Sequence, residues 1–175
     1  MSSLARTSFR ILAIDPSYRG FGFAILEGGS LLVDWGIKSA RERTDAQISI
    51  KIKELIVLYR PQAVVLEDEA GKGSRRCQRL QALFEMVEAL VSGQRTTVCR
   101  FSAKQVRSLF ARFGAASKDD RARVIVQTFP ELAPRLPPVR KAWMSEDYRM
   151  GIFDAVSLGL TFFFSRGSTP SAAVS

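Results

Sequence analysis

The sequence predicts an α/β fold built on a five-stranded mixed sheet, in which three antiparallel strands precede two parallel strands and helices cover both faces. Two observations support this prediction. Short apolar runs over residues 9–14 and 63–66 have the length and composition of strands buried on both faces. The order of segments is the second observation, because glycine-containing turns join the early strands before an amphipathic helix begins.

The first three predicted strands form an antiparallel meander. The first apolar run ends at Asp15 and is followed by a turn. A second strand covers residues 22–26, and Gly28 and Gly29 turn the chain into a third strand over residues 31–37. Short glycine turns of this kind join neighbouring antiparallel strands.

A stretch whose apolar residues have the spacing of an amphipathic helix follows the meander. Thr44 and Gln47 form a predicted capping box at its start. Five apolar residues share one face of this helix: Ile48, Ile52, Leu55, Ile56 and Tyr59. Because a crossover helix normally joins two parallel strands, the strand that ends at Glu67 is expected beside the strand that ends at Asp15. Both acids would then lie at one edge of the sheet.

The rest of the chain predicts one further strand and several helices. In order, these are a helix over 77–91, a strand over 96–101, two short helices capped by Ser102 and Ser117, a proline-containing loop over 130–139, and a helix from Ser145 to about Phe164. We expect one domain over residues 9–165, with flexible ends at 1–8 and 166–175.

Composition favours some partners and excludes several mechanisms. The 175 residues include 26 basic and 17 acidic side chains, a formal charge of +9, which favours a polyanionic partner such as nucleic acid or an anionic membrane surface. The chain has no histidine, so catalytic mechanisms and zinc sites that need one are excluded. Its two cysteines are too few for a closed zinc site and suit a reducing compartment, where they would serve as small core residues.

No segment predicts insertion into a membrane. None approaches the roughly 18 consecutive apolar residues that a spanning helix requires, and the first eight residues lack the apolar core of a signal peptide. We therefore expect a soluble, cytoplasmic protein with no membrane partner.

Three acids stand in or directly after apolar runs: Asp15, Glu67 and Asp154. An ionised carboxylate in such surroundings is unfavourable unless it is paired or holds a cation. Gathered carboxylates suit Mg²⁺, with Mn²⁺ as an alternative, and two such ions can promote phosphodiester hydrolysis. Each acid has a structural alternative. Asp15 could form a turn before Pro16, Glu67 could begin a solvated loop, and Asp154 could pair with an arginine.

Four segments carry a resemblance to known motifs. They are Ile11 to Gly22 around Asp15-Pro16, Val64 to Glu67, Phe101 to Lys118, and Asp154-Ala155 with Leu158. Together they resemble motifs of the ribonuclease H-like nucleases, and among these the RuvC-type Holliday junction resolvases. The resemblance extends from about Arg10 to Phe164.

The resemblance implies a ribonuclease H-like fold and specific roles for individual residues. The metal-binding catalytic residues would be Asp15, Glu67 and Asp154. The residues near DNA phosphates would be Lys104, Arg107 and Lys118. It also implies a homodimer that cuts branched DNA, such as four-way junctions, by two-metal catalysis.

The sequence departs from the family pattern before the last acid. The family often carries another Asp or His three residues before that acid, and here the position is Gly151. Asp147 is a candidate for the missing ligand, because on a continuous helix it would lie on the same face as Asp154. The alternative is that Asp147 stabilises the start of that helix through its dipole.

A cluster of basic residues follows the second acid. It comprises Arg75, Arg76 and Arg79. Such residues bind phosphates without reading the base sequence. They would also form the solvated face of an amphipathic helix, so the pattern alone leaves both interpretations open.

Three other functions remain compatible with the sequence. The first is a ribonuclease H-like nuclease that acts on RNA, a hybrid or another recombination intermediate. The second is a nucleotide-binding domain of the actin or sugar-kinase type, although those folds usually need a second domain. The third is a catalytically inactive junction-binding module, which the loss of a ligand at Gly151 would explain.

Overall fold

The computed structural model describes residues 8–18, 20–39, 44–68 and 73–167. Five strands form one sheet with the order β3-β2-β1-β4-β5. Their bounds are β1 Arg10–Ser17, β2 Gly20–Glu27, β3 Leu31–Ser39, β4 Ala63–Asp68 and β5 Thr97–Ser102. β1, β2 and β3 are antiparallel, whereas β4 pairs parallel with both β1 and β5. This confirms the predicted mixed sheet. Residues 1–7 and 168–175, most of the ends that we predict to be flexible, lie outside the described residues.

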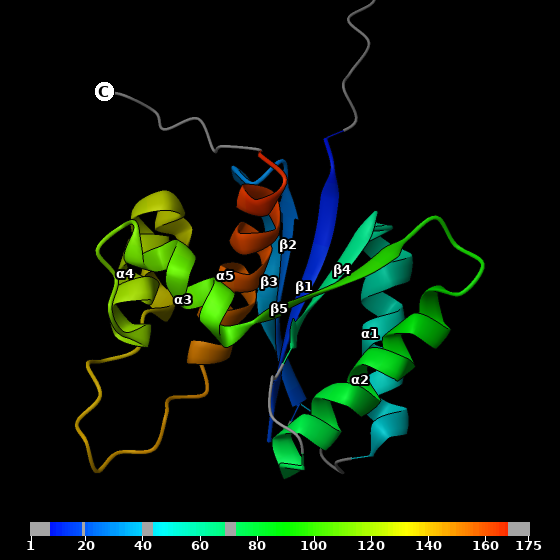
Figure 1. Ribbon diagram of the computed structural model, residues 1–175, viewed down its shortest axis with the longest axis horizontal. Helices are drawn as coiled ribbons and strands as arrows, with labels where there is room; N and C mark the ends of the chain where they lie inside the picture. Colours follow the sequence, from blue (N-terminus) through cyan, green and yellow to red (C-terminus); the bar gives the residue numbers. More distant parts are fainter. Residues whose placement is uncertain (1–7, 19, 40–43, 69–72, 168–175) are drawn as a thin grey trace, which may run out of the picture.

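Helices cover both faces of the sheet (Figure 1). One face packs against α1 (Asp45–Tyr59) and α2 (Arg75–Val91). The other face packs against α5 (Met150–Ser165), with α3 (Ala103–Ala111), α4 (Lys118–Thr128) and the 3₁₀ helix η1 (Pro130–Arg135) in the same apolar core. The sheet is therefore the middle of three layers.

Side-chain alternation along β1 determines which face receives its terminal acid. Ile11 and Ala13 pack in the core on the α5 side, whereas Leu12 and Ile14 pack in the core that includes α1 and α2. Because successive strand residues point to opposite faces, Asp15 belongs with Ile11 and Ala13. It therefore faces α5.

The same alternation applies to β4. Ala63 and Val65 pack on the α5 side, and Glu67 is the next residue in this series. β1 and β4 are parallel neighbours, with Ile14 opposite Leu66 in the register. Asp15 and Glu67 consequently lie at one edge and on one face of the sheet.

Glycines allow α5 to approach the sheet closely. A Cβ atom at Gly22 would lie 2.1 Å from the carbonyl oxygen of Gly151, and one at Gly159 would lie 2.5 Å from Leu26 Cδ1. The contact at Gly22 involves backbone, which cannot move aside as a flexible side chain can. Glycine at this position therefore brings the start of α5 against β2, beside the end of β1.

Two predicted elements differ from the structure. Residues 130–135 form a 3₁₀ helix rather than a loop, because Pro130 is tolerated at the first helical position and Leu132 is buried in the core. The last helix begins at Met150, not after Ser145. The Asp147 carboxylate accepts a hydrogen bond from the Arg149 backbone N–H at 2.9 Å, and this local turn replaces the first helical turn.

The predicted helix starts at Thr44, Ser102 and Ser117 are confirmed by capping hydrogen bonds to the third residue of each helix. The latter two are complete capping boxes. In the described part of the chain, no helix combines the length and apolar character needed to cross a membrane.

Candidate active site

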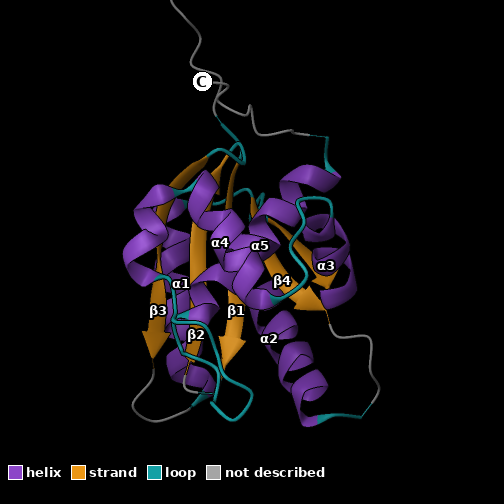
Figure 2. Ribbon diagram, turned by 90° about the vertical axis from the view of Figure 1, so that its left-hand side faces the viewer, coloured by secondary structure: helices purple, strands orange, loops and turns teal. Residues whose placement is uncertain are grey.

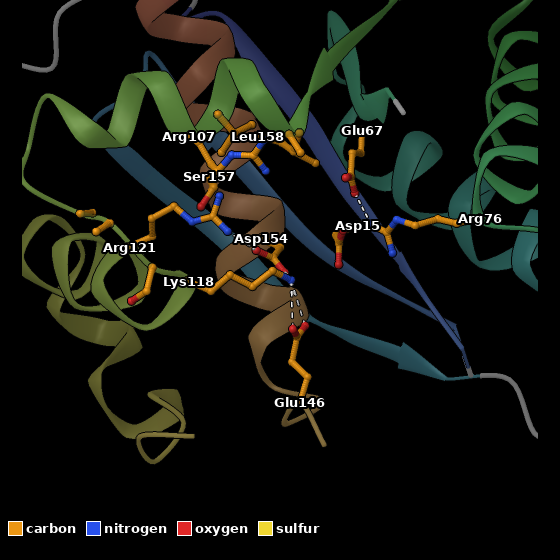
Figure 3. Close-up of a pocket in the computed structure, with 15 residues that line it drawn as sticks. Asp15, Glu67, Arg76, Arg107, Lys118, Arg121, Glu146, Asp154, Ser157 and Leu158 are labelled. Carbon is orange, nitrogen blue, oxygen red and sulfur yellow. Dashed lines mark hydrogen bonds and ion pairs between the residues drawn. The ribbon is translucent and has the colours of Figure 1, made fainter. Parts of the chain in front are cut away.

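Three acids from three different elements face one cavity of about 370 Å³ (Figure 3). Asp15 comes from the end of β1, Glu67 from the end of β4, and Asp154 from the first turns of α5. The cavity also contains cationic side chains and one further acid: Arg76, Arg107, Lys118, Arg121 and Glu146. The structure thus brings together the three acids that stand out in the sequence.

Asp15 is the most deeply placed of these acids, with 8% of its surface exposed. No hydrogen bond or ion pair joins its carboxyl group to another residue in the described ranges. Burial raises the pKa of Asp15 well above its ordinary value and the nearby Asp154 and Glu67 raise it further, while the charges of Lys118 and Arg76 offset only part of this rise. The ionised form of Asp15 is therefore unfavourable unless a cation is added.

Glu67 interacts with a cation from α2. Its Oε2 atom accepts a hydrogen bond from Arg76 at 2.5 Å. Arg76 lies in the first turn of α2, which is capped by the hydroxyl of Ser74. The position of this arginine follows from where α2 begins, directly after the loop that leaves β4.

Asp154 interacts with two cations from α4. Lys118 Nζ lies 2.8 Å from one carboxylate oxygen and Arg121 lies 3.4 Å from the other. Lys118 also contacts both oxygens of Glu146, at 3.0 and 3.1 Å. Figure 3 shows the lysine extending between the two acids. Burial lowers the pKa of Lys118, but the charges and hydrogen bonds of Asp154 and Glu146 outweigh it and raise the pKa above its ordinary value.

Two residues of this site are missing from the sequence prediction. Arg121 lies three residues after Lys118 on α4, and the capping box at Ser117 fixes the start of that helix. Residues at this spacing share one helical face, so the capping signal could have indicated Arg121. Glu146 precedes α5 in irregular structure, and no periodic pattern indicates where its side chain lies.

Asp147 does not line the cavity that contains Asp15. It lies before α5, so the argument that it shares a helical face with Asp154 is wrong. Its carboxylate accepts two side-chain hydrogen bonds from Arg149, at 2.9 and 2.6 Å, which lower the pKa of Asp147. It faces a neighbouring cavity of about 640 Å³, which we call the loop cavity.

The predicted phosphate-binding residues fall into three places. Arg76, Arg107 and Lys118 line the cavity with the acids. Arg75 and Arg79 line a separate cavity of about 690 Å³ that adjoins the turn after β1. Lys104 lies at another surface, beside Phe164 near the end of α5. The structure therefore gathers half of the six predicted residues around the acids.

The acids of the site have the chemistry to bind a divalent cation, but their present positions do not form a coordination site. Among the described residues, no group of three acids or cysteines could hold a metal ion as placed. Glu67 and Asp154 instead contact protein cations, while Asp15 remains buried without a partner. Three carboxylates, of which the buried Asp15 has no ion-pair partner in the described ranges, are a donor set appropriate to Mg²⁺ or Mn²⁺. Coordination would require Arg76, Lys118 and Arg121 to release these acids.

Comparison with known proteins adds evidence for the fold. No family model matches the sequence, and no curated protein sequence matches it. Among solved structures, RuvC of Thermus thermophilus in complex with a Holliday junction substrate aligns with a TM-score of 0.66 and 15% identity, covering 91% of this chain and 96% of that chain. A second T. thermophilus RuvC structure gives a TM-score of 0.65 and 18% identity, covering 91% and 97%.

A viral protein shows the same architecture. The fowlpox virus resolvase, in complex with Holliday junction DNA, aligns with a TM-score of 0.55 and 14% identity, covering 90% of this chain and 98% of that chain. These similarities place the chain in the ribonuclease H-like fold class. Within that class, it has the fold of RuvC-type Holliday junction resolvases.

Proposed function

We propose that the protein is a metal-dependent, structure-selective endonuclease that hydrolyses phosphodiesters of branched DNA, such as four-way junctions. The observation that carries this proposal is the convergence of Asp15, Glu67 and Asp154 on one cavity, with Asp15 buried and without a partner. Support also comes from the fold, because similar chains from two sources were solved with Holliday junction DNA.

The three acids would hold the metal. Bound Mg²⁺ or Mn²⁺ ions supply an activated water and neutralise charge on the phosphate, the chemistry of two-metal phosphodiester hydrolysis. The chain contributes the positions of Asp15 and Glu67 through adjacent parallel strands, and the position of Asp154 through the close contact of α5 with β2.

The cationic side chains of the site would bind the phosphate. Lys118 and Arg121 now neutralise Asp154, and Arg76 neutralises Glu67. Once these acids hold a cation, the same side chains become available within the cavity for the charge that develops on the scissile phosphate. Lys118 is suited to this role, because Glu146 would remain beside it, and the hydrogen bond and charge of Glu146 raise the pKa of the ammonium.

The wider surface would hold the rest of the substrate. Arg107 lines the site itself, and Arg75 and Arg79 lie beside the end of β1, where they could contact neighbouring phosphates. The net charge of +9 would strengthen such binding at low salt. A homodimer with two-fold symmetry would place one such site on each of two opposed strands of a four-way junction.

The test is cleavage of an end-labelled four-way junction with Mg²⁺, Mn²⁺ or EDTA. Linear duplex, a fork, a single strand and an RNA–DNA hybrid serve as competing substrates. We expect paired nicks near the branch point that require the metal. Asp15→Asn, Glu67→Gln and Asp154→Asn should each reduce cleavage to the EDTA background while retaining junction binding. Preferential cutting of another substrate would instead establish a different nuclease on the same fold.

A second candidate is a junction-binding module that does not cut. Two observations favour it: Gly151 supplies no side chain before Asp154, and protein cations already neutralise Glu67 and Asp154. Thermal unfolding with increasing Mg²⁺ or Mn²⁺ separates the candidates. A metal-binding nuclease should show a rising Tm that Asp15→Asn abolishes, whereas a purely binding module should bind junctions without this rise.

A further inference from the structure

The segment between η1 and α5, residues 136–149, has an unusual surface, and we call it the connecting segment. Trp143 is 79% exposed and Tyr148 is 70% exposed, the two largest exposed fractions among the exposed large apolar side chains in the described ranges. The segment lies at the same end of the molecule as the C-terminal end of β1 (Figures 1 and 2). Exposed tryptophan and tyrosine side chains are enriched at interaction sites, and aromatic rings of this kind stack on the bases of single-stranded nucleic acid.

The charge of the connecting segment suits an anionic partner. Its two acids are already paired, Glu146 with Lys118 and Asp147 with Arg149. Within the part of the chain that the structure describes, Arg140 and Lys141 have no acidic partner. These two cations therefore leave a local positive charge beside the aromatic side chains.

Local contacts orient the cations. Arg140 donates a hydrogen bond from Nε to the Met144 carbonyl oxygen at 2.7 Å, which leaves its two terminal nitrogens for a phosphate. Lys141 Nζ lies 5.4 Å from the centre of the Trp143 ring. The segment thus presents cations and aromatic rings within a short stretch of chain.

The loop cavity lies between the connecting segment and the start of α4. Its lining includes Pro137, Arg140, Met144 and Tyr148 from the connecting segment. The loop cavity and the candidate active site share three lining residues: Ser117, Lys118 and Glu146. A nucleotide in the loop cavity would therefore lie next to the cavity that would hold the scissile phosphate.

We propose that the connecting segment and the loop cavity bind a nucleotide whose base face is exposed at the branch point or in a single strand of the substrate, next to the candidate active site. Tyr148 and Trp143 stack on exposed base faces, while Arg140 and Lys141 bind phosphates. A linear duplex offers phosphates but few exposed base faces, so this site favours branched or single-stranded DNA. This inference rests on the proposed function and adds a binding site to it.

Binding measured in EDTA tests the site independently of cleavage. Fluorescently labelled four-way junction, single strand and linear duplex are titrated with the full-length protein, Trp143→Ala and Tyr148→Ala. We expect each variant to bind the junction and the single strand roughly tenfold more weakly, the loss typical of one base-stacking contact. Duplex binding should change less than about twofold, since phosphate contacts remain. Leu31→Ala removes an exposed side chain at the β2–β3 turn and serves as the matched control.

Tryptophan fluorescence provides a direct second measurement. The chain has two tryptophans, so Trp35→Phe leaves Trp143 as the single reporter. We expect its emission to be quenched by the junction and by a single strand, and much less by a duplex. Unchanged emission and unchanged affinity of both alanine variants would overturn the site and assign the aromatic surface to a protein partner. Equal weakening on all three DNAs would also overturn it.

These outcomes separate the inference from the proposed function. A protein that cuts junctions while Trp143→Ala and Tyr148→Ala bind like the wild type retains its function and loses this site. A protein that binds junctions through both aromatic side chains but never cuts retains this site and loses the endonuclease function.

Discussion

Two aspartates on the sheet, Asp15 at the end of β1 and Asp34 within β3, are in opposite electrostatic situations. Asp34 accepts hydrogen bonds from the Tyr59 hydroxyl at 2.5 Å and from the Trp35 backbone N–H at 2.8 Å. Asp15 is buried, faces two other acids, and contacts no donor among the described residues. The hydrogen bonds of Asp34 stabilise the fold, whereas the ionised form of Asp15 destabilises it.

This difference separates a structural acid from a functional candidate. A buried carboxylate without a partner lowers stability, so an unpartnered acid in a cavity is a reasonable candidate for cation binding or catalysis. Asp147 resembles Asp34 in this respect, because Arg149 satisfies it. Glu67 and Asp154 are also paired with cations, so they differ from Asp147 in position: both line the cavity that contains the unpartnered Asp15.

The largest expected difference within a pair of residues is in cleavage rate, between a lysine inside the candidate active site and a lysine outside it. Lys118 lines the candidate active site, whereas Lys104 lies at another surface. We expect Lys118→Ala to slow junction cleavage by about a hundredfold, since it removes a charge directed at the phosphate. Lys104→Ala should slow cleavage by less than about threefold. Single-turnover rates at saturating protein measure both, and equal losses would remove the distinction between the two lysines.

The next effect is on stability and concerns the close contact between β2 and the start of α5, which places Asp154 near the end of β1. An added Cβ at Gly22 would meet the Gly151 carbonyl oxygen at 2.1 Å, whereas one at Gly151 would meet Ile37 Cδ1 at 3.4 Å. Gly22→Ala should therefore destabilise the protein by roughly 1–3 kcal/mol, because α5 must move away from β2. Gly151→Ala should be neutral or gain up to about 1 kcal/mol from helix propensity. Urea unfolding measures both, and equal destabilisation would contradict the asymmetric contact.

The sequence predicts most of the sheet because its signals are local. Glycine turns indicate the antiparallel meander. The helical spacing of apolar residues that follows indicates a crossover helix, which makes β4 parallel to β1. The adjacency of Asp15 and Glu67 follows from that topology and is confirmed by the register. Strand alternation, applied to Ile11 and Ala13, also indicates that the acid faces α5.

Other features of the site depend on contacts that are distant in sequence. The bonds from Lys118 to Glu146 and Asp154 span 28 and 36 residues, and nothing in the local pattern of either segment specifies them. The sequence predicts the start of α5 at the wrong residue for a different reason. There, hydrogen bonds between Asp147 and Arg149 form a turn where the sequence is equally compatible with helix.

A smaller effect tests the two aspartates directly. At pH 7 in EDTA, Asp15→Asn should raise the free energy of unfolding by about 1 kcal/mol, or roughly 2–4 °C in Tm, because it removes a repelled, buried charge. Asp34→Asn should lower that free energy by about 1 kcal/mol, because it weakens the charged acceptor of two hydrogen bonds. Urea unfolding of the two variants beside the wild type provides the measurement. A loss of stability in both would show that Asp15 has a stabilising partner.

The smallest effect is a pH dependence of the free energy of unfolding, caused by the hydrogen bond between Tyr59 and Asp34 of β3. The hydrogen bond to Asp34, followed by burial, raises the pKa of Tyr59 from 10.0 to about 12. The folded state then holds this proton more tightly than the unfolded state. The stabilisation is therefore complete below pH 10 and is lost as pH rises towards about 12.

Tyr59→Phe isolates this contribution. At pH 8 we expect the variant to be about 0.5–1 kcal/mol less stable than the wild type, a modest loss because the ring is partly exposed. Between pH 10 and 12 the difference in urea midpoint should shrink, since the unfolded tyrosine ionises above pH 10 while the folded hydroxyl keeps its proton up to about pH 12. A constant difference across this range would mean that ring packing, rather than the hydrogen bond, stabilises this side of the sheet. Asp34 would then be less well satisfied than its contacts indicate, and its contrast with Asp15 would weaken.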